Sequence, residues 1–463
     1  MDSVKRAFSF KRLAIILACN ISLFIILYSF LPFSRNENLG ICLLFFIGIL
    51  WITEAIHVSL TALLVPILSI LLGLKNTQDA FSTFANPIIF LFFGGFALAT
   101  ALHMQGIDKL IAQKLIVLAR GRVKLAVFML FFVTAFLSMW ISNTATAAIM
   151  LPLGLGVLSN LNAKKERNTF VFVLLGIAYS ASIGGFGTLV GSPPNAIAAA
   201  TLGIDFLGWM KFGIPFMLIM LPSCLFILFL VLRPRLESNF SITLEKAEWN
   251  YHKSLTIIIF ILMALAWIFS TKISSMLGGV KDIDSVIAII GAIAIGLCGC
   301  ASWRDIQKST DWGVLWLFGG GLALGNIIKD SGASAVMASV IANFLGLGAE
   351  SGEIGVANLL LIVVVSAVFV IILTEFTSNT ASTSLLIPVF ASLSAALNLE
   401  ESILTLVIGF GASCAFMLPV ATPPNAIVFG SGYIRQIEMI KAGVCLGVFS
   451  VFVLAIFAVF VWS

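Results

Sequence analysis

The stretch ISNTATAAIMLP (residues 141–152) recurs as TSNTASTSLLIP (residues 377–388), 236 residues further along the chain. Each copy carries a polar Ser-Asn-Thr triplet inside a long apolar segment and ends on a proline. Ser, Asn and Thr are preferred at helix N-termini, because their side chains satisfy the free N–H groups of the first turn. Each triplet therefore predicts a turn followed by a helix, within sequence that is otherwise apolar.

The composition places both triplets in a membrane protein. Hydrophobic residues make up 60% of the 463 residues and charged residues only 10%, against roughly 25% charged in a soluble domain. The 26 Lys and Arg exceed the 21 Asp and Glu by five, and they lie in short clusters, which argues against a basic surface for nucleic acid. The chain has no GxxxxGKS/T motif for ATP.

Apolar stretches of about 20 residues predict membrane-spanning helices. The predicted fold is an all-α polytopic membrane protein with about 11 transmembrane helices and two re-entrant helical hairpins. The predicted crossings lie near residues 13–33, 39–56, 58–74, 88–107, 169–204, 212–232, 254–271, 284–300, 313–345, 403–430 and 442–462.

The two segments around the triplets do not fit simple crossings. Residues 125–163 carry no charge and have Arg and Lys on both sides, whereas residues 354–399 have Glu350 and Glu353 before them and Glu400 and Glu401 after them. Basic flanks are typical of the cytoplasmic face, so the two hairpins are predicted to enter from opposite faces. For the first segment, the flanks leave open two full crossings with the turn in the outer water.

Two further motifs recur in the same order. GGFAL (94–98) returns as GGLAL (320–324) at an offset of 226, and GSPPNAI (191–197) returns as ATPPNAI (421–427) at an offset of 230. These offsets are close to the 236 of the triplets, which indicates one duplicated unit. Because the hairpin flanks have opposite charge, the duplication is predicted to be inverted in the membrane, as in many secondary transporters. The predicted fold is therefore that of an inverted-repeat transporter.

The duplication divides the chain into a first repeat (1–232), a polar cytoplasmic linker (233–253) and a second repeat (254–463). The basic start, with Lys11 and Arg12 before the first apolar run, predicts a cytoplasmic N-terminus. An odd number of crossings then predicts an external C-terminus. The expected location is the plasma (inner) membrane.

The chemistry of the motifs favours a hard cation together with an anion. Ser hydroxyls, Asn amides and unwound carbonyls supply oxygen ligands without a carboxylate cage, and this suits Na⁺ better than Mg²⁺ or a transition metal. The glycines of GGFGTLVG (184–191) allow backbone to approach an ion closely. No Lys, Arg or His occurs between Lys329 and Arg435, so an anion there needs neutral donors, helix N-termini and bound cations.

The paired triplets and Pro-Pro-Asn motifs, with WITEA (51–55) and FANP (84–87), resemble the divalent anion/sodium symporter family that includes the INDY transporters. The resemblance covers nearly the whole chain. It implies a homodimer with a scaffold domain and an elevator-like transport domain. It also implies import of small dicarboxylates such as succinate, malate or fumarate, coupled to Na⁺.

Carried over residue by residue, the resemblance implies which side chains bind substrate and ion. The implied substrate contacts are Asn143, Thr144, Ser192, Asn379, Thr380, Thr422 and Pro423. The implied ligands are Ser138, Ser142, Asn143 and Gly191 for one Na⁺, and Thr374, Thr377, Asn379 and Ala421 for a second. Thr377 stands where the family tolerates small or varied residues, and Ser192 stands where many members carry Thr, which keeps the hydroxyl. Glu375, one turn before the second triplet, has no assigned role.

Several alternatives remain at this stage. A citrate or sulfate symporter, or a dicarboxylate exchanger of the same fold, would share these motifs, and a channel is a further class. An intramembrane hydrolase with Ser142 or Ser378 as nucleophile needs a general base, but His57, His103 and His252 lie far from the triplets in sequence. The chain is therefore not expected to be an enzyme.

The opposite charge of the two sets of flanks makes the predicted topology testable. Single cysteines at Lys124 and Glu353, in a background without the seven native cysteines, should react with an impermeant thiol reagent from opposite faces of the membrane. Labelling of both positions from the same face would contradict the inverted arrangement.

Overall fold

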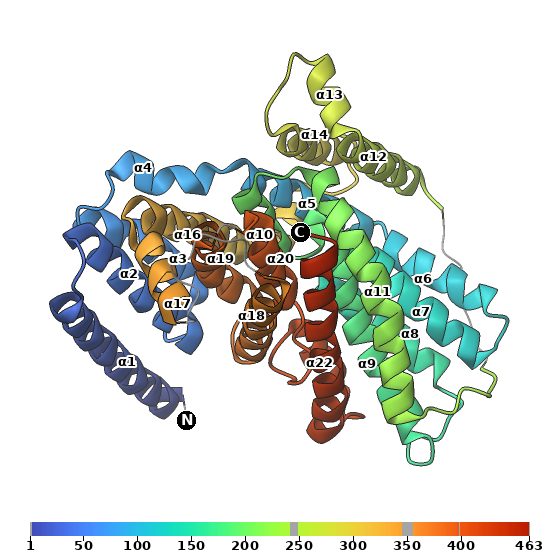
Figure 1. Cartoon of the computed structure of the whole chain (residues 1–463). Helices are drawn as coiled ribbons and strands as arrows, with labels where there is room; N and C mark the ends of the chain where they lie inside the picture. The colour runs from blue at the N-terminus through green and yellow to red at the C-terminus, as the bar shows by residue number, and fades with distance from the viewer. Residues whose placement is uncertain (1, 241–248, 345–354, 398, 463) are drawn as a thin grey trace. The chain divides into compact units, whose positions relative to one another are not determined.

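The computed structural model describes residues 2–240, 249–344, 355–397 and 399–462. Across these ranges the regular elements are helices, and one isolated antiparallel β-bridge pairs Arg122 with Asn239. Residues 241–248 of the predicted linker and the flanking Glu350 and Glu353 lie outside the described ranges. The described helices form two compact units, and each unit draws on both halves of the sequence (Figure 1).

Unit 1 comprises residues 1–86, 312–412 and 454–463. Its centre is α16, which packs against α3 and α19, while α19 also packs against α17 and α20. The elements of this unit are α1 (Asp2–Phe30), α2 (Arg35–Thr53), α3 (Val58–Leu71), α4 (Thr77–Ser82), η1 (Thr83–Ala85), α16 (Trp312–Asp330), α17 (Ala333–Phe344), α18 (Val356–Phe376), α19 (Asn379–Ala396) and α20 (Glu401–Gly411).

Unit 2 comprises residues 87–311 and 413–453. Its core helix is α9, which packs against α7, α8, α11 and α21. The elements of this unit are α5 (Pro87–Met104), α6 (Ile107–Leu118), α7 (Val123–Ser138), α8 (Asn143–Val157), α9 (Arg167–Gly184), η2 (Gly185–Gly187), η3 (Leu189–Gly191), α10 (Pro193–Leu202), α11 (Phe206–Leu232), α12 (Tyr251–Ile268), α13 (Ser270–Met276), α14 (Ile283–Leu297), α15 (Trp303–Ser309), α21 (Pro423–Gly430) and most of α22 (Gln436–Phe460).

The helices confirm an all-α polytopic membrane protein. Within the described ranges, nine helices are long and apolar enough to cross a membrane. The predicted crossings at 58–74 and 284–300 form shorter helices, α3 with 14 residues and α14 with 15. At 1.5 Å per residue, a 14-residue helix spans about 21 Å, less than the hydrocarbon core.

Three predicted crossings are interrupted. Residues 313–345, predicted as one crossing, form α16 and α17 instead, separated by a turn at Gly332 with φ of 81°. Residues 169–204 end α9 at Gly184, pass through two short 3-10 turns and resume in α10, and residues 403–430 are divided between α20 and α21. Hydropathy alone counts these stretches as continuous, because the interrupting residues are small or apolar.

The two triplet segments form helical hairpins. The chain turns between α7 and α8 at the first triplet and between α18 and α19 at the second. The arms α7 and α8 pack side by side in Figure 1, and α18 contacts α19. The predicted turn-then-helix structure is therefore confirmed at both triplets, while the entry of the hairpins from opposite membrane faces stays a prediction.

Hydrogen bonds between the sequence halves recur with a constant offset. In unit 1, Ser59 Oγ on α3 donates to the carbonyl of Gly313 on α16 (3.2 Å). In unit 2, Ser285 Oγ on α14 donates to the carbonyl of Pro87 on α5 (2.6 Å). The differences 285 minus 59 and 313 minus 87 are both 226, the offset of the GGFAL and GGLAL motifs. The same interhelical bond is thus made once in each unit.

The glycines of these motifs let the paired helices approach closely. A Cβ atom on Gly94 of α5 would lie 2.5 Å from the backbone oxygen of Ala288 on α14, and one on Gly320 of α16 would lie 2.6 Å from Cα of Ala62 on α3. Ala62 and Ala288 are again 226 residues apart. Each unit therefore uses one glycine to seat a helix from one half of the sequence against a helix from the other.

This packing predicts that Gly94→Ala destabilises the protein. The added methyl group has no space against Ala288, and overpacking of this kind costs about 1–3 kcal/mol. Thermal unfolding of the purified protein in detergent measures the effect. The control is Gly296→Ala near the end of α14, where an added Cβ meets nothing within 4 Å. Equal melting temperatures for the two variants would contradict the close-packing role.

Candidate ion and substrate site

The first triplet lies where α7 ends and α8 begins. Ser142 is the N-cap of α8 and its side chain accepts a hydrogen bond from the backbone N–H of Ala145 (3.3 Å). The predicted capping role is confirmed here. The N–H groups of the first helical turn, with the positive end of the helix dipole, face the polar turn.

Beside this turn, oxygen atoms from three segments of unit 2 come together. Ser138 Oγ donates to the carbonyl of Ala181 on α9 (2.7 Å) and lies 2.6 Å from Oδ1 of Asn143. A Cβ on Gly185 would lie 2.7 Å from Oδ1 of Asn143, and one on Gly191 would lie 2.5 Å from the carbonyl oxygen of Gly185. The predicted set Ser138, Asn143 and Gly191 therefore does gather, and the glycines are what permit it.

The amide of Asn143 fits this cluster in two orientations. With its oxygen toward Ser138 it accepts that hydroxyl, while its nitrogen in the same position would donate to Ser138 Oγ (2.6 Å), Ala181 O (3.1 Å) and Gly191 O (3.2 Å). In the first orientation the amide oxygen lies beside the carbonyl oxygens of Ala181 and Gly191, which cannot donate to it, and only the Ser138 hydroxyl can. Turning the amide would remove the repulsion between these acceptor oxygens. A cation bound among them would do the same, since hard cations prefer oxygen ligands.

The second triplet in unit 1 repeats this hydrogen bonding. Thr374 Oγ1 donates to the carbonyl of Ala412 (2.7 Å) and to Oδ1 of Asn379 (2.7 Å). Thr374 and Asn379 stand 236 residues after Ser138 and Asn143. Ser378 occupies the N-cap position of α19 but makes no side-chain capping bond, unlike its counterpart Ser142.

The hydroxyl of Thr377 already has two partners. It donates to the carbonyl of Leu373 (3.0 Å) and pairs with Ser382 Oγ (2.5 Å). These contacts give Ser382 a role in fixing the turn. Of the predicted second Na⁺ ligands, Thr374, Thr377 and Asn379 belong to unit 1, whereas Ala421 belongs to unit 2.

Each Pro-Pro-Asn motif begins a helix after a break. Ser192 and Thr422 are the N-caps of α10 and α21, and prolines fill the first two helical positions, where a missing N–H costs nothing. Thr422 accepts from the N–H of Asn425 (3.3 Å), while Ser192 is buried 3.5 Å from Ser413 Oγ. Helix α21 packs on α8, so the first triplet and the second Pro-Pro-Asn motif lie on neighbouring helices.

The asparagines of these motifs hold the broken backbone in place. Asn195 Nδ2 donates to the carbonyls of Gly185 and Thr188 (both 2.7 Å). Asn425 Nδ2 donates to the carbonyls of Ala415 (3.2 Å) and Leu418 (3.1 Å). Both asparagines are fully buried, and Oδ1 of each has no hydrogen-bond partner among the described residues. Sequence reasoning noted the motif but missed this role, because the partners are backbone carbonyls.

The charge around the polar turns is low. In the described ranges, no group of three or more His, Cys, Asp and Glu could hold a metal ion. Glu375, next to the Na⁺ candidate Thr374, is buried. A cation at these turns would be bound by hydroxyl, amide and carbonyl oxygens, as predicted for Na⁺.

Broken helices and polar hairpin turns inside an apolar helical bundle are the architecture of many polytopic membrane transporters. Residues 48–409 match the family model described as a citrate transporter, CitMHS. The sodium-dependent dicarboxylate transporter SdcS of Staphylococcus saprophyticus is 33% identical over 449 residues, covering 89% of this chain and 83% of that protein. The chain belongs to the divalent anion/sodium symporter family, and the resemblance noted in the sequence is confirmed.

Other similar proteins agree with this assignment. An uncharacterized transporter of Haemophilus influenzae is 53% identical over 97% of both chains, and one of Methanocaldococcus jannaschii is 39% identical over 91% of this chain and 93% of that one. The solved structure of the YdaH transporter of Alcanivorax borkumensis has a TM-score of 0.54 at 15% identity, covering 82% of this chain and 86% of that one. At that identity the structural likeness shows the fold alone.

The asparagine contacts predict matched effects in the two repeats. Asn195→Ala and Asn425→Ala should each lower the free energy of unfolding, because each leaves two buried carbonyls unpaired at about 1–3 kcal/mol per lost partner. Thermal unfolding in detergent measures the loss. Asn36→Ala on the exposed surface of α2 is the control. If all three variants melted alike, the clamping role would be wrong.

Proposed function

We propose that this protein is a Na⁺-coupled secondary transporter that imports small dicarboxylates such as succinate, malate or fumarate by elevator-type alternating access. The observation that carries the proposal is the gathering of Ser138, Asn143 and the carbonyls of Ala181, Gly185 and Gly191. This cluster offers oxygens to a cation. Relatives that are 33% identical to this chain are named sodium-dependent dicarboxylate transporters, and this supports the proposal.

The proposed ion ligands follow the two triplets. Ser138, Ser142, Asn143 and Gly191 would bind one Na⁺, and Thr374, Thr377, Asn379 and Ala421 would bind a second. The recurring bonds of Ser138 to Asn143 and of Thr374 to Asn379 support equivalent roles. Thr377 is the weakest ligand of the set, since its hydroxyl is engaged by Leu373 and Ser382.

The proposed substrate contacts are the N-terminal ends of helices. Asn143 and Thr144 begin α8, and Asn379 and Thr380 begin α19, so each triplet offers a side-chain amide and hydroxyl next to free N–H groups. Ser192, Thr422 and Pro423 begin α10 and α21 in the same way. Helix N-termini favour carboxylates, and Na⁺ would supply the positive charge that Lys or Arg supplies elsewhere.

Citrate is the second candidate substrate, because the matching family model is described as a citrate transporter. A carrier for citrate would use the same hairpin turns and Na⁺ ligands. Competition of labelled succinate uptake by citrate distinguishes the two, since the preferred anion inhibits at the lower concentration.

The remaining features of the proposal concern assembly and orientation. We propose a homodimer whose repeats are inverted in the membrane, with the N-terminus in the cytoplasm and the C-terminus outside. The opposite charges that flank the two hairpins support this orientation. The hydrogen bonds that recur at an offset of 226 support the duplication.

Replacing the triplet asparagines tests the site. Asn143→Ala and Asn379→Ala should each abolish Na⁺-driven succinate uptake in proteoliposomes, because each residue is proposed to contact both ion and substrate. Size-exclusion chromatography should show that both variants remain folded. Asn36→Ala should transport normally. Unchanged uptake by both triplet variants would remove the site assignment.

A further inference from the structure

The first turn of α14 contains a buried acid that the proposed ion and substrate site does not use. Asp284 is 7% exposed, and its Oδ2 accepts a hydrogen bond from the backbone N–H of Phe206 (2.8 Å). Phe206 is the first residue of α11, directly after the loop that follows the broken helix α10. Burying a carboxylate is costly unless hydrogen bonds replace its hydration, so this contact calls for an explanation.

The equivalent position in the other repeat carries no acid. Position 284 corresponds to Val58 at the offset of 226. The backbone contact is the same at both positions, since Trp267 Nε1 donates to the carbonyl of Asp284 (3.0 Å) and Trp51 Nε1 donates to the carbonyl of Val58 (3.1 Å). The repeated helix packing therefore uses the backbone at this position and does not need a carboxylate. The acid is particular to unit 2, the unit that contains the first triplet.

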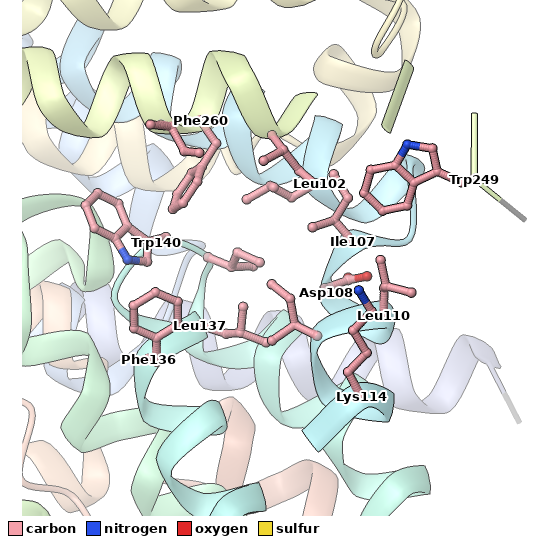
Figure 2. A pocket seen from close by; sticks show the side chains of 14 residues that line it. Leu102, Ile107, Asp108, Leu110, Lys114, Phe136, Leu137, Trp140, Trp249 and Phe260 are labelled. Carbon is pink, nitrogen blue, oxygen red and sulfur yellow. The ribbon is translucent and has the colours of Figure 1, made fainter. Parts of the chain in front are cut away.

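The side chain of Phe206 connects Asp284 to the turn before the first triplet. Its ring stacks on Trp267 (4.8 Å between ring centroids) and on Trp140 (6.2 Å). Trp140 also lines an apolar cavity of about 250 Å³ (Figure 2), and a wall atom gains no packing contact from empty space. The position of Trp140 therefore depends on the rings that stack on it. Asn143 of the ion cluster follows three residues later.

Helix α11 also reaches the other side of the oxygen cluster. Three residues after Phe206, Trp209 Nε1 donates to the carbonyl of Phe186 (2.9 Å), and both of these aromatic side chains are fully buried. A Cβ on Gly213 of α11 would lie 2.2 Å from the same carbonyl oxygen, so the helix packs closely on this break. Phe186 directly follows Gly185 of the cluster. The start of α11 thus contacts both segments that supply oxygens to the cluster.

We propose that Asp284 is a positioning residue for the first Na⁺ site and acts by fixing the start of α11 through the N–H of Phe206. The inference rests on the proposed function, because it assumes that Na⁺ binds in the cluster around Asn143. Without the carboxylate, the N–H of Phe206 is buried and unpaired, which folded proteins avoid. The first turn of α11 then shifts, and its contacts with Trp140 and Phe186 shift with it. Binding sites need their ligands held to within about 0.5 Å, so Na⁺ affinity falls.

Uptake of labelled succinate into proteoliposomes, measured over a range of external NaCl concentrations, tests the proposal. Asp284→Val introduces the residue of the other repeat, keeps the backbone contact of Trp267 and removes the acceptor. It should raise the half-saturating Na⁺ concentration about tenfold, as loss of an outer-shell partner does at metal sites. Uptake at saturating Na⁺ should stay within about twofold of the wild type, because lost binding leaves the maximal rate unchanged. Asp284→Asn keeps an oxygen for Phe206 and should behave like the wild type.

A destabilised variant separates positioning from a general loss of stability. Gly94→Ala disturbs the packing of α5 on α14 and leaves the contact between Asp284 and Phe206 in place. It should lower the melting temperature without changing the half-saturating Na⁺ concentration. If Asp284→Val does not fold, Trp209→Phe removes the donor to Phe186, keeps an aromatic ring and should raise the half-saturating Na⁺ concentration in the same way.

The outcomes distinguish this inference from the proposed function. Wild-type uptake that does not respond to Na⁺ would remove both together. Na⁺-dependent wild-type uptake with an unchanged half-saturating concentration in Asp284→Val, or in Trp209→Phe where that variant replaces it, would overturn the inference alone. The same holds if Asp284→Asn is impaired as much as Asp284→Val, or if Gly94→Ala raises the half-saturating concentration equally.

Discussion

The structure depends on satisfying backbone carbonyls where helices break inside apolar sequence. In the hydrocarbon of a membrane, an unpaired backbone group costs several kcal/mol, so irregular backbone persists only where protein or a polar cavity meets its hydrogen bonds. Asn195 and Asn425 do this at equivalent breaks, each donating to two carbonyls. Ser138 and Thr374 meet the carbonyls of Ala181 and Ala412 in the same manner. The polar side chains of the motifs thus stabilise the interrupted backbone, and the side-chain and carbonyl oxygens at the first triplet lie close together.

The duplication explains why the contacts come in pairs. Helices α5 and α14 in unit 2, and α16 and α3 in unit 1, each join one helix from the first half of the sequence to one from the second. Gly94 and Gly320 occupy equivalent places in these pairs. Neither half supplies both partners of its own helix pair, so the two halves must fold together. Small departures, such as the engaged hydroxyl of Thr377, mark where the repeats have diverged.

Much of this architecture is predictable from residues alone, for definable reasons. The triplets predict both hairpin turns because Ser and Asn have strong local preferences for helix N-termini, and the offsets reveal the duplication. The backbone partners Ala181, Gly185 and Ala412 were not predicted, since a carbonyl leaves no signature in side-chain identity. The division of residues 313–345 at Gly332 was also missed, because a glycine turn hardly lowers the hydropathy of a long apolar stretch. The sequence offsets between the repeated motifs also do not indicate which helices pack together, and the packing of α5 on α14 is seen only in the structure.

The central claim is that Na⁺ provides the positive charge for anion binding at turns without basic side chains. A ligand that binds the folded state raises the melting temperature, and the stabilisation grows with the logarithm of its concentration above the dissociation constant, so thermal unfolding in detergent can detect binding without transport. Succinate should raise the melting temperature in NaCl and leave it unchanged in choline chloride at the same ionic strength. An equal rise in both salts would contradict the account.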